Sequence, residues 1–290
     1  MELIIAENCK FKENLEPIKH DIFNYLYNLI KECGNNKIEK IIIADNDFNN
    51  YKLTVEEMTK KVKQCSKISE NGFGVVIAGT DKNNKYTQYI VVNCAIVIGF
   101  WNYVCGKIDE YIEEYALCYA TLLHEIGHCI HYYILYSKYN YLGATKSKYD
   151  SYNKKDLEEY IYHQCITLTS EYYAQRFMNS IYKEKEWDNT KEILDIINNE
   201  DFSSRASNLN KIYRLIYFFI LYISYYHANS LKPKIYEKIH NLSIRDSLKK
   251  IENELINFYN NFENPKNNFK NIINIFKEIY DIKYSSHDRI

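Results

Sequence analysis

The chain has 290 residues, and its 37 basic and 38 acidic side chains leave a formal net charge of −1. This balance argues against a basic nucleic-acid-binding surface and against an acidic tail. The length suffices for one large domain or two small ones with a sizeable core.

The eight cysteines fall in apolar stretches and form no CxxC pair. This pattern is typical of buried free thiols in a reducing compartment. The first residues lack a basic segment followed by an apolar one, so no signal peptide is predicted. The longest apolar run, residues 215–226, is shorter than the roughly 18 residues of a bilayer span and predicts a core helix. We expect a cytoplasmic protein without membrane contact, although a toxin exported by a non-standard route would have the same composition.

The first part of the chain predicts alternating helices and strands. Apolar residues at helical spacing predict a helix over 11–34. The Ile-rich segment 37–45 predicts a buried strand. The segment 54–65 predicts a helix, because Thr54 and Glu57 have the spacing of a capping box.

Two β-rich runs around the polar turn TDKNNK predict a hairpin within residues 72–100. A helical pattern then runs from about Ile108 to Tyr136. After it the chain predicts helices only, over 155–184, 189–199, 207–230, 244–262 and 267–282. This order indicates an α+β fold with a small sheet, a long helix and a mostly helical C-terminal part. We expect two subdomains, 1–107 and 108–290, which form one catalytic unit with a cleft between them.

The motif HEIGH lies in the long helix and places His124 and His128 four residues apart. Two such histidines share one helix face and can bind one ion. Zinc catalysis needs three protein ligands and an open position. Glu125 then lies where it can take a proton from the water that the metal activates. Random placement would produce this motif in roughly one such chain in fifty, so a third ligand is needed to support it.

Glu171, in the helical stretch ITLTSEYYAQRFMNSIY, is the candidate for the third ligand. It borders an apolar stripe and should lie at the edge of the core. A carboxylate there needs a partner, because an unpaired buried charge is costly, and a metal ion suits it. The stripe consists of Leu157, Ile161, Cys165, Leu168 and Tyr172.

HEIGH followed by EYYAQRF resembles the gluzincin metallopeptidases, and is most similar to the anthrax lethal factor catalytic-domain family of bacterial endopeptidases. The resemblance covers about residues 38–184. It implies a zincin-like fold, Zn²⁺ held by His124, His128 and Glu171, and Glu125 as the general base. It also implies a peptide or protein substrate and endopeptidase activity.

The sequence departs from this family at two positions. Gln175 occupies the position, four residues after Glu171, where an acidic residue often orients a zinc ligand. Gln164 replaces the tyrosine that stabilises the oxyanion in the lethal-factor group. We expect His163 to take that role, because histidine does so in other gluzincins. Tyr162, Gln164 or a C-terminal tyrosine or histidine are the alternatives.

Three other features have simpler interpretations. His131 projects near the metal-binding face, but we expect it to pack or to support a ligand. The segment 45–56 has ligand-type residues at EF-hand positions but lacks the usual glycine, so a polar strand-to-helix loop is expected rather than a calcium site. The strand over 88–97 is expected to form the sheet edge with which an extended substrate pairs, as in zincins.

Two functions compete with a zinc metallopeptidase. Gln164 and Gln175 favour a catalytically weak or inactive regulatory or binding protein that keeps the zincin fold. A structural protein with a chance HExxH motif is the other alternative. The sequence predicts neither the substrate sequence nor the oligomeric state.

Overall fold

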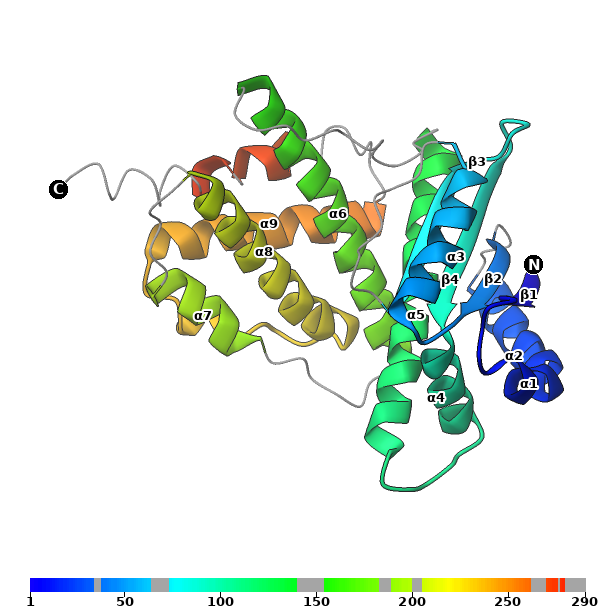
Figure 1. The fold of residues 1–290 in the computed structure, drawn as a ribbon. Helices are drawn as coiled ribbons and strands as arrows, with labels where there is room; N and C mark the ends of the chain where they lie inside the picture. The colour runs from blue at the N-terminus through cyan, green and yellow to red at the C-terminus, as the bar shows by residue number, and fades with distance from the viewer. Residues whose placement is uncertain are drawn as a thin grey trace. The chain divides into compact units, whose positions relative to one another are not determined.

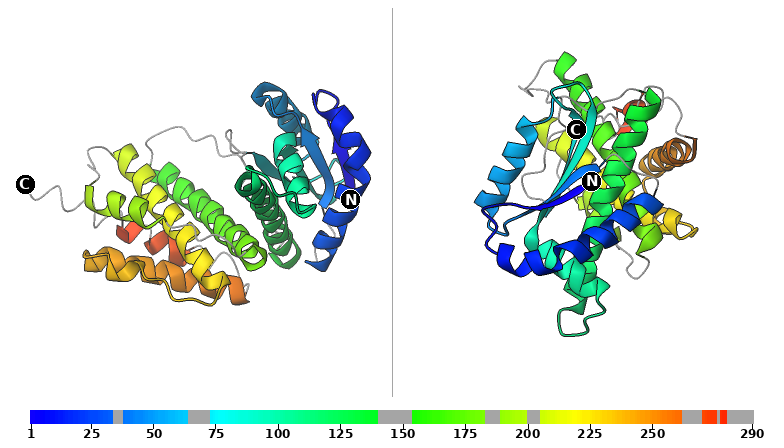
Figure 2. Two further views of the ribbon diagram at one scale, coloured as in Figure 1. Left: turned by 90° about the horizontal axis from the view of Figure 1, so that it is seen from below. Right: turned by 90° about the vertical axis from the view of Figure 1, so that its right-hand side faces the viewer.

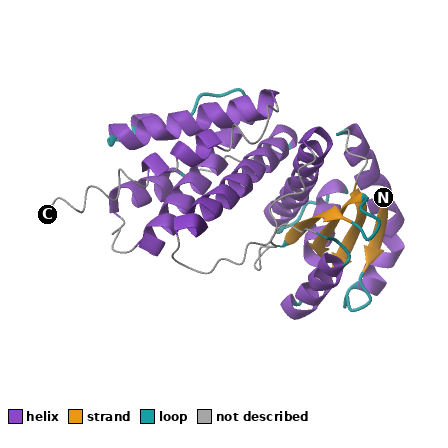
Figure 3. Cartoon of the chain, turned by 90° about the horizontal axis from the view of Figure 1, so that it is seen from above, coloured by secondary structure: helices purple, strands orange, loops and turns teal. Residues whose placement is uncertain are grey.

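The computed structural model describes residues 1–33, 38–63, 73–139, 154–182, 189–199, 205–261, 270–275 and 277–279. Contacts between residues divide the chain into two compact units, Met1–Ser147 and Lys148–Ile290. The first unit combines a four-stranded sheet with helices, and the described part of the second is helical (Figures 1 and 3). The α+β class predicted from the sequence is therefore confirmed.

A mixed sheet forms the centre of the first unit, with its strands in the order β1-β2-β4-β3. Strand β2 (Ile38–Ala44) pairs in parallel with β1 (Glu2–Ile5) and with β4 (Tyr86–Asn93). Strand β3 (Gly74–Thr80) is antiparallel to β4, as the hairpin pattern predicted. Strand β1 was not predicted, because so short an apolar segment has no periodicity to distinguish a strand from a helix.

The hairpin turn between β3 and β4 is held by one carboxylate. Asp81 Oδ1 accepts hydrogen bonds from the backbone N–H groups of Asn83 and Lys85. Asn84 has a φ of 59°, a left-handed conformation that asparagine tolerates better than most residues. The polar residues between the two strands therefore determine where the chain reverses.

The prediction that residues 88–97 form the free edge of the sheet is wrong. Strand β4 has β2 on one side and β3 on the other, and the described sheet has β1 and β3 at its two edges. The chain leaves the sheet after Asn93, whose side chain accepts a hydrogen bond from the N–H of Ala95 and caps helix α4 (Cys94–Val104). A short apolar run is compatible with a buried strand or a buried helix, which is why the pattern misplaced this boundary.

The helix predicted over 11–34 is interrupted near its start. Helix α1 (Lys12–Leu15) is followed by the 3₁₀ turn η1 (Glu16–Ile18) and then by α2 (Lys19–Glu32). Pro17 lies within η1. Proline has no N–H to donate, so it breaks the regular helical hydrogen bonding at this point.

Helix α3 (Phe48–Lys60) begins earlier than the predicted start at Thr54. Its N-cap is Asp47, whose side chain accepts hydrogen bonds from the N–H groups of Asn49 and Asn50. The predicted capping box of Thr54 and Glu57 is therefore wrong. Residues 45–47 alone separate β2 from α3, so the segment is a strand-to-helix loop and not a twelve-residue calcium loop.

Helices pack on both faces of the sheet in the first unit (Figure 2). Helix α3 packs on one face, over alternate residues of β2, β3 and β4. Those buried residues are Ile42, Ala44, Val75, Ile77, Tyr89 and Val91. The long helix α5 (Ile112–Tyr139) contacts β3 and β4 and packs against α4. Helix α5 thus belongs to the same compact unit as the sheet. The expected subdomains, 1–107 and 108–290, placed α5 apart from the sheet. Their role as two halves of one catalytic unit stays a prediction.

The second unit contains α6 (Lys154–Ile181), α7 (Thr190–Asn199), α8 (Arg205–Ala228), the 3₁₀ turn η2 (Ile235–Glu237) and α9 (Leu242–Asn261). Residues 270–275 and 277–279 are also helical. Helix α8 packs on α6 and α7, and its apolar run 215–226 contributes much of the core, as predicted. Within the described residues, no helix is long and apolar enough to cross a membrane.

Seven cysteines lie in the described residues, and none of them forms a disulfide. Cys9, Cys94, Cys129 and Cys165 are buried, whereas Cys105 is exposed. The prediction of free thiols therefore holds for these seven, although one of them faces solvent. Cys65 lies outside the described residues.

Candidate metal centre

Helix α5 carries His124 and Glu125 on one turn and His128 on the next. The Nε2 atoms of His124 and His128 lie 3.0 Å apart, and their rings meet edge to face with centroids 4.6 Å apart. His128 is 8% exposed, and His124 and Glu125 are half-buried. The opposite side of this turn is anchored in the core by Leu122, Leu123, Ile126, Cys129 and Ile130. The helix thus presents two imidazole nitrogens to one point.

Glu125 packs against the first residue of the edge strand β3. A Cβ atom on Gly74 would lie 2.8 Å from Cγ and 3.1 Å from Cδ of Glu125, closer than side chains normally approach. Alternation along β3 places Gly74 on the face opposite Val75, which packs toward α3. A side chain on residue 74 would therefore displace Glu125 from this position. A glycine in a strand can mark such a close approach, and Gly74 was the available signal in the sequence.

Tyr51 of α3 is a second neighbour of Glu125. Burial raises the pKa of the Tyr51 hydroxyl, and the negative charge of Glu125 raises the pKa further. The hydroxyl donates a long hydrogen bond, 3.5 Å, to the carbonyl oxygen of Val91 in β4. Tyr51 is thus neutral near pH 7, and it was not among the predicted site residues.

In the second unit, Glu171 lies on α6 at the edge of the core, as predicted. It is half-buried, whereas Tyr172 is fully buried and Leu168 and Cys165 are 1% and 0% exposed. The side chains of Leu157 and Ile161 lie outside the described residues. Tyr217 of α8 is a neighbour of Glu171: burial raises the pKa of its hydroxyl, and the Glu171 carboxylate raises it further.

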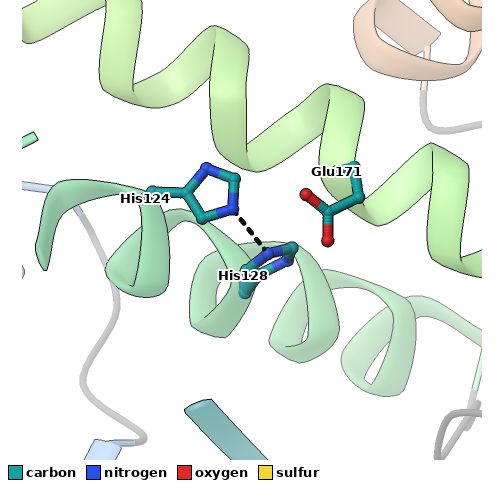
Figure 4. Close-up of side chains that lie close together, drawn as sticks. All are labelled: His124, His128 and Glu171. Carbon is teal, nitrogen blue, oxygen red and sulfur yellow. Dashed lines mark hydrogen bonds between the residues drawn. The ribbon is translucent and has the colours of Figure 1, made fainter. Parts of the chain in front are cut away.

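His124, His128 and Glu171 each offer one ligand atom, and these three atoms lie within 4.8 Å of one another (Figure 4). The described residues contain no other such group of three or more histidine, cysteine, aspartate or glutamate side chains. The histidines belong to the first unit and the glutamate to the second. The binding of one ion by all three is therefore a proposal rather than an observed feature.

The predicted oxyanion donor, His163, belongs to α6, but its side chain lies outside the described residues, as does that of Tyr162. Gln164 is half-buried and Gln175 is 7% exposed. His163 therefore stays a prediction, as does the alternative of a C-terminal tyrosine, for which Tyr217 is the described neighbour of Glu171.

His131 is fully buried on α5 and does not belong to the group of three. Burial lowers its pKa to about 3, with a smaller contribution from His128, so its ring is neutral at physiological pH. This environment fits the expectation of a packing or supporting role.

Comparisons with known proteins do not add to this description. No family model, curated protein or solved structure matches the chain.

Proposed function

We propose that the protein is a zinc-dependent metallopeptidase of the gluzincin type. Its ligands are His124, His128 and Glu171, and Glu125 is its general base. The observation that carries the proposal is the group of three possible ligand atoms within 4.8 Å of one another. The motif that supplies two of them also places a glutamate beside the first histidine.

The chemistry of these donors fits zinc. A tetrahedral zinc ion binds imidazole nitrogen at about 2.0–2.1 Å, which puts two such nitrogens roughly 3.3 Å apart. The Nε2 atoms of His124 and His128 are 3.0 Å apart, so small rotations of the rings suffice. A carboxylate from Glu171 completes three protein ligands and leaves a fourth position open. Zinc bound there would polarise the substrate carbonyl and lower the pKa of a water molecule to about 7.

Glu125 performs the proton transfers. Its carboxylate accepts a proton from the attacking water and then passes it to the nitrogen of the leaving amine. The close approach of Gly74 restricts the space in which this side chain can move. General-base catalysis depends on such placement, because the base must reach the proton that it abstracts.

The substrate is an extended peptide that lies along β3. This strand is one edge of the described sheet and is antiparallel to its neighbour β4. An edge strand offers backbone N–H and C=O groups to a peptide of any sequence. At the end of β3, Thr80 already exchanges backbone hydrogen bonds with Lys63, so the peptide would pair with the residues that precede Thr80. Because Gly74 touches Glu125, a peptide bound along β3 would pass the general base.

Metal analysis and peptide cleavage test this proposal. The purified wild-type protein should retain about one zinc ion per chain and cleave a broad peptide library. Glu125→Gln should retain the zinc and lose roughly 10²–10⁴-fold in turnover. Glu114→Gln is the matched control, because Glu114 is exposed on the same helix, and it should behave as the wild type.

The absence of zinc from the wild-type protein would contradict the whole proposal. Zinc binding without any cleavage by the wild type would instead favour the regulatory or binding protein, for which the uncharged, buried Gln175 is the supporting observation.

A further inference from the structure

A chain of hydrogen-bonded polar side chains connects α6, α8 and α9, and it begins at Tyr172, the residue after Glu171. The hydroxyl of Tyr172 lies 2.7 Å from His227 Nδ1, and His227 Nε2 lies 2.7 Å from Glu252 Oε1. The other carboxylate oxygen of Glu252 accepts a hydrogen bond from the hydroxyl of Tyr236. Arg176, one turn after Tyr172, donates to the Tyr172 hydroxyl at 3.1 Å.

Each polar group in this chain has a partner of suitable chemistry. The Glu252 carboxylate accepts a hydrogen bond from His227 Nε2, and His227 Nδ1 is hydrogen-bonded to the Tyr172 hydroxyl. The Tyr172 hydroxyl accepts from Arg176. Arg176 and Glu252, which are of opposite charge, lie at opposite ends of the chain of hydrogen bonds.

The network is buried. Tyr172 is fully buried, and the side chains of His227 and Glu252 are 9% and 13% exposed. A polar network with its partners satisfied in a low-dielectric interior favours one arrangement, because any other leaves buried groups unpaired. Its three connected helices are therefore held in one register relative to one another.

Aromatic contacts hold the same turn of α6. The guanidinium of Arg176 lies 3.7 Å from the ring centroid of Tyr259 in α9, at stacking distance. The rings of Tyr172 and Tyr173 also pack against Tyr259, with centroids 6.1 and 5.1 Å away. Helix α6 is thus fixed from α8 and α9 over the turn that follows Glu171.

Neighbouring residues on a helix point about 100° apart, so fixing Tyr172 fixes the direction of Glu171. A metal ligand has to be held within about 0.5 Å and 10–20° of its productive geometry. We propose that Tyr172, His227 and Glu252 are positioning residues, which hold α6 so that the Glu171 carboxylate points toward its metal. This inference rests on the proposed zinc function.

The position of this support differs from the one expected for a gluzincin. An acidic residue four positions after the ligand would orient the site from α6 itself, and Gln175 has no charge. Here the buried carboxylate is Glu252 of α9, which acts through His227 and Tyr172. The C-terminal helices thereby acquire a role in metal binding without contributing a ligand.

Zinc affinity of the full chain tests the inference. Tyr172→Phe keeps the ring and removes only the hydroxyl that joins α6 to His227. The dissociation constant for Zn²⁺, measured by competition with a chelator, should rise about 10–100-fold, the usual effect of losing a supporting partner. Glu252→Gln, which keeps the size of the side chain, should shift it in the same direction. In the Co²⁺-loaded protein, both changes should alter the visible absorption bands of the metal.

Tyr222→Phe is the matched control. Tyr222 is 2% exposed on α8, and its hydroxyl accepts a hydrogen bond from the backbone N–H of Lys234. Both Tyr222→Phe and Tyr172→Phe should lower the melting temperature. Tyr222→Phe should leave the zinc dissociation constant unchanged. A merely structural role for Tyr172 would make the two variants alike in both measurements.

The outcomes separate this inference from the proposed function. If the wild type binds zinc and both Tyr172→Phe and Glu252→Gln stay within twofold of its dissociation constant, the positioning role is overturned and the zinc site stands. If the wild type binds no zinc, the proposed function fails, and the positioning role fails with it.

Discussion

The two units hold their candidate site residues by different means. In the first, His124, Glu125 and His128 lie on a helix beside a sheet, and the absent side chain of Gly74 makes room for the base. In the second, Glu171 depends on side-chain contacts among helices. Hydrogen bonds between strands set the backbone spacing of a sheet, whereas packing and polar contacts set the rotation of a helix. The position of Glu125 in the first unit should therefore be sensitive to an added methyl group on the neighbouring strand. The position of Glu171 in the second unit should be sensitive to the loss of interior side chains.

The largest effect on stability is expected for Phe219→Ala in the second unit. Phe219 is fully buried in the core of the helical unit, and its truncation should lower the free energy of unfolding by about 3–5 kcal/mol. Hydrogen exchange should accelerate in peptides from α6, α8 and α9. Phe218→Ala, at the half-buried neighbouring position, should cost less. An equal acceleration in peptides from β2 and β4 would contradict the division into two units.

A smaller effect, on catalysis, is expected for Gly74→Ala in the first unit. The new Cβ would force Glu125 to move, and a misplacement of about 1 Å can cost roughly 100-fold in rate. Zinc content should be retained, because the change does not touch the histidines. Cleavage rate per bound zinc is the measurement.

Gly99→Ala is the control for this change. A Cβ at Gly99 would lie 2.5 Å from Cys118 Sγ, so this variant also strains the first unit, away from Glu125. It should lower the melting temperature and leave the rate per zinc intact. Equal rates for the two variants would remove the special role of Gly74.

The smallest effect is expected for Asp47→Ala at the start of α3. Loss of the N-cap should cost about 1 kcal/mol of unfolding free energy. Asp47→Asn should retain most of the stability, because asparagine caps helices about as well. Denaturant unfolding of both variants measures the difference. A loss as large for Asp47→Asn would show that the charge matters more than the capping hydrogen bonds.

Much of the fold was predictable because its periodic signals are long. The helices over 155–184, 189–199, 207–230 and 244–262 match α6 to α9 closely, since each repeats an apolar stripe over several turns. The structure of short or wholly apolar segments was not predictable in this way. Strand β1 is too short to show a period, and the run after Asn93 is apolar throughout, so neither segment distinguishes strand from helix.

Some features of the candidate site were likewise predictable from the sequence, and others were not. Local spacing predicted that His124 and His128 share a helix face, and their nitrogens are 3.0 Å apart. The amphipathic pattern also predicted that Glu171 borders the core. Spacing could not predict that Gly74 approaches Glu125 or that the charge of Glu125 acts on Tyr51, because these residues lie far apart in the sequence.

The sequence by itself determined what depends on local geometry: the face that the two histidines share, the helix that carries Glu171, and the core helix over 215–226. Tertiary structure alone decided which strand lies at the sheet edge, which glycine accommodates the base, and which side chains hold the turn after Glu171. The physical reason is that a helical period relates residues within a few positions of one another. Strand order and contacts between helices depend instead on how distant segments pack, and no local period encodes that packing.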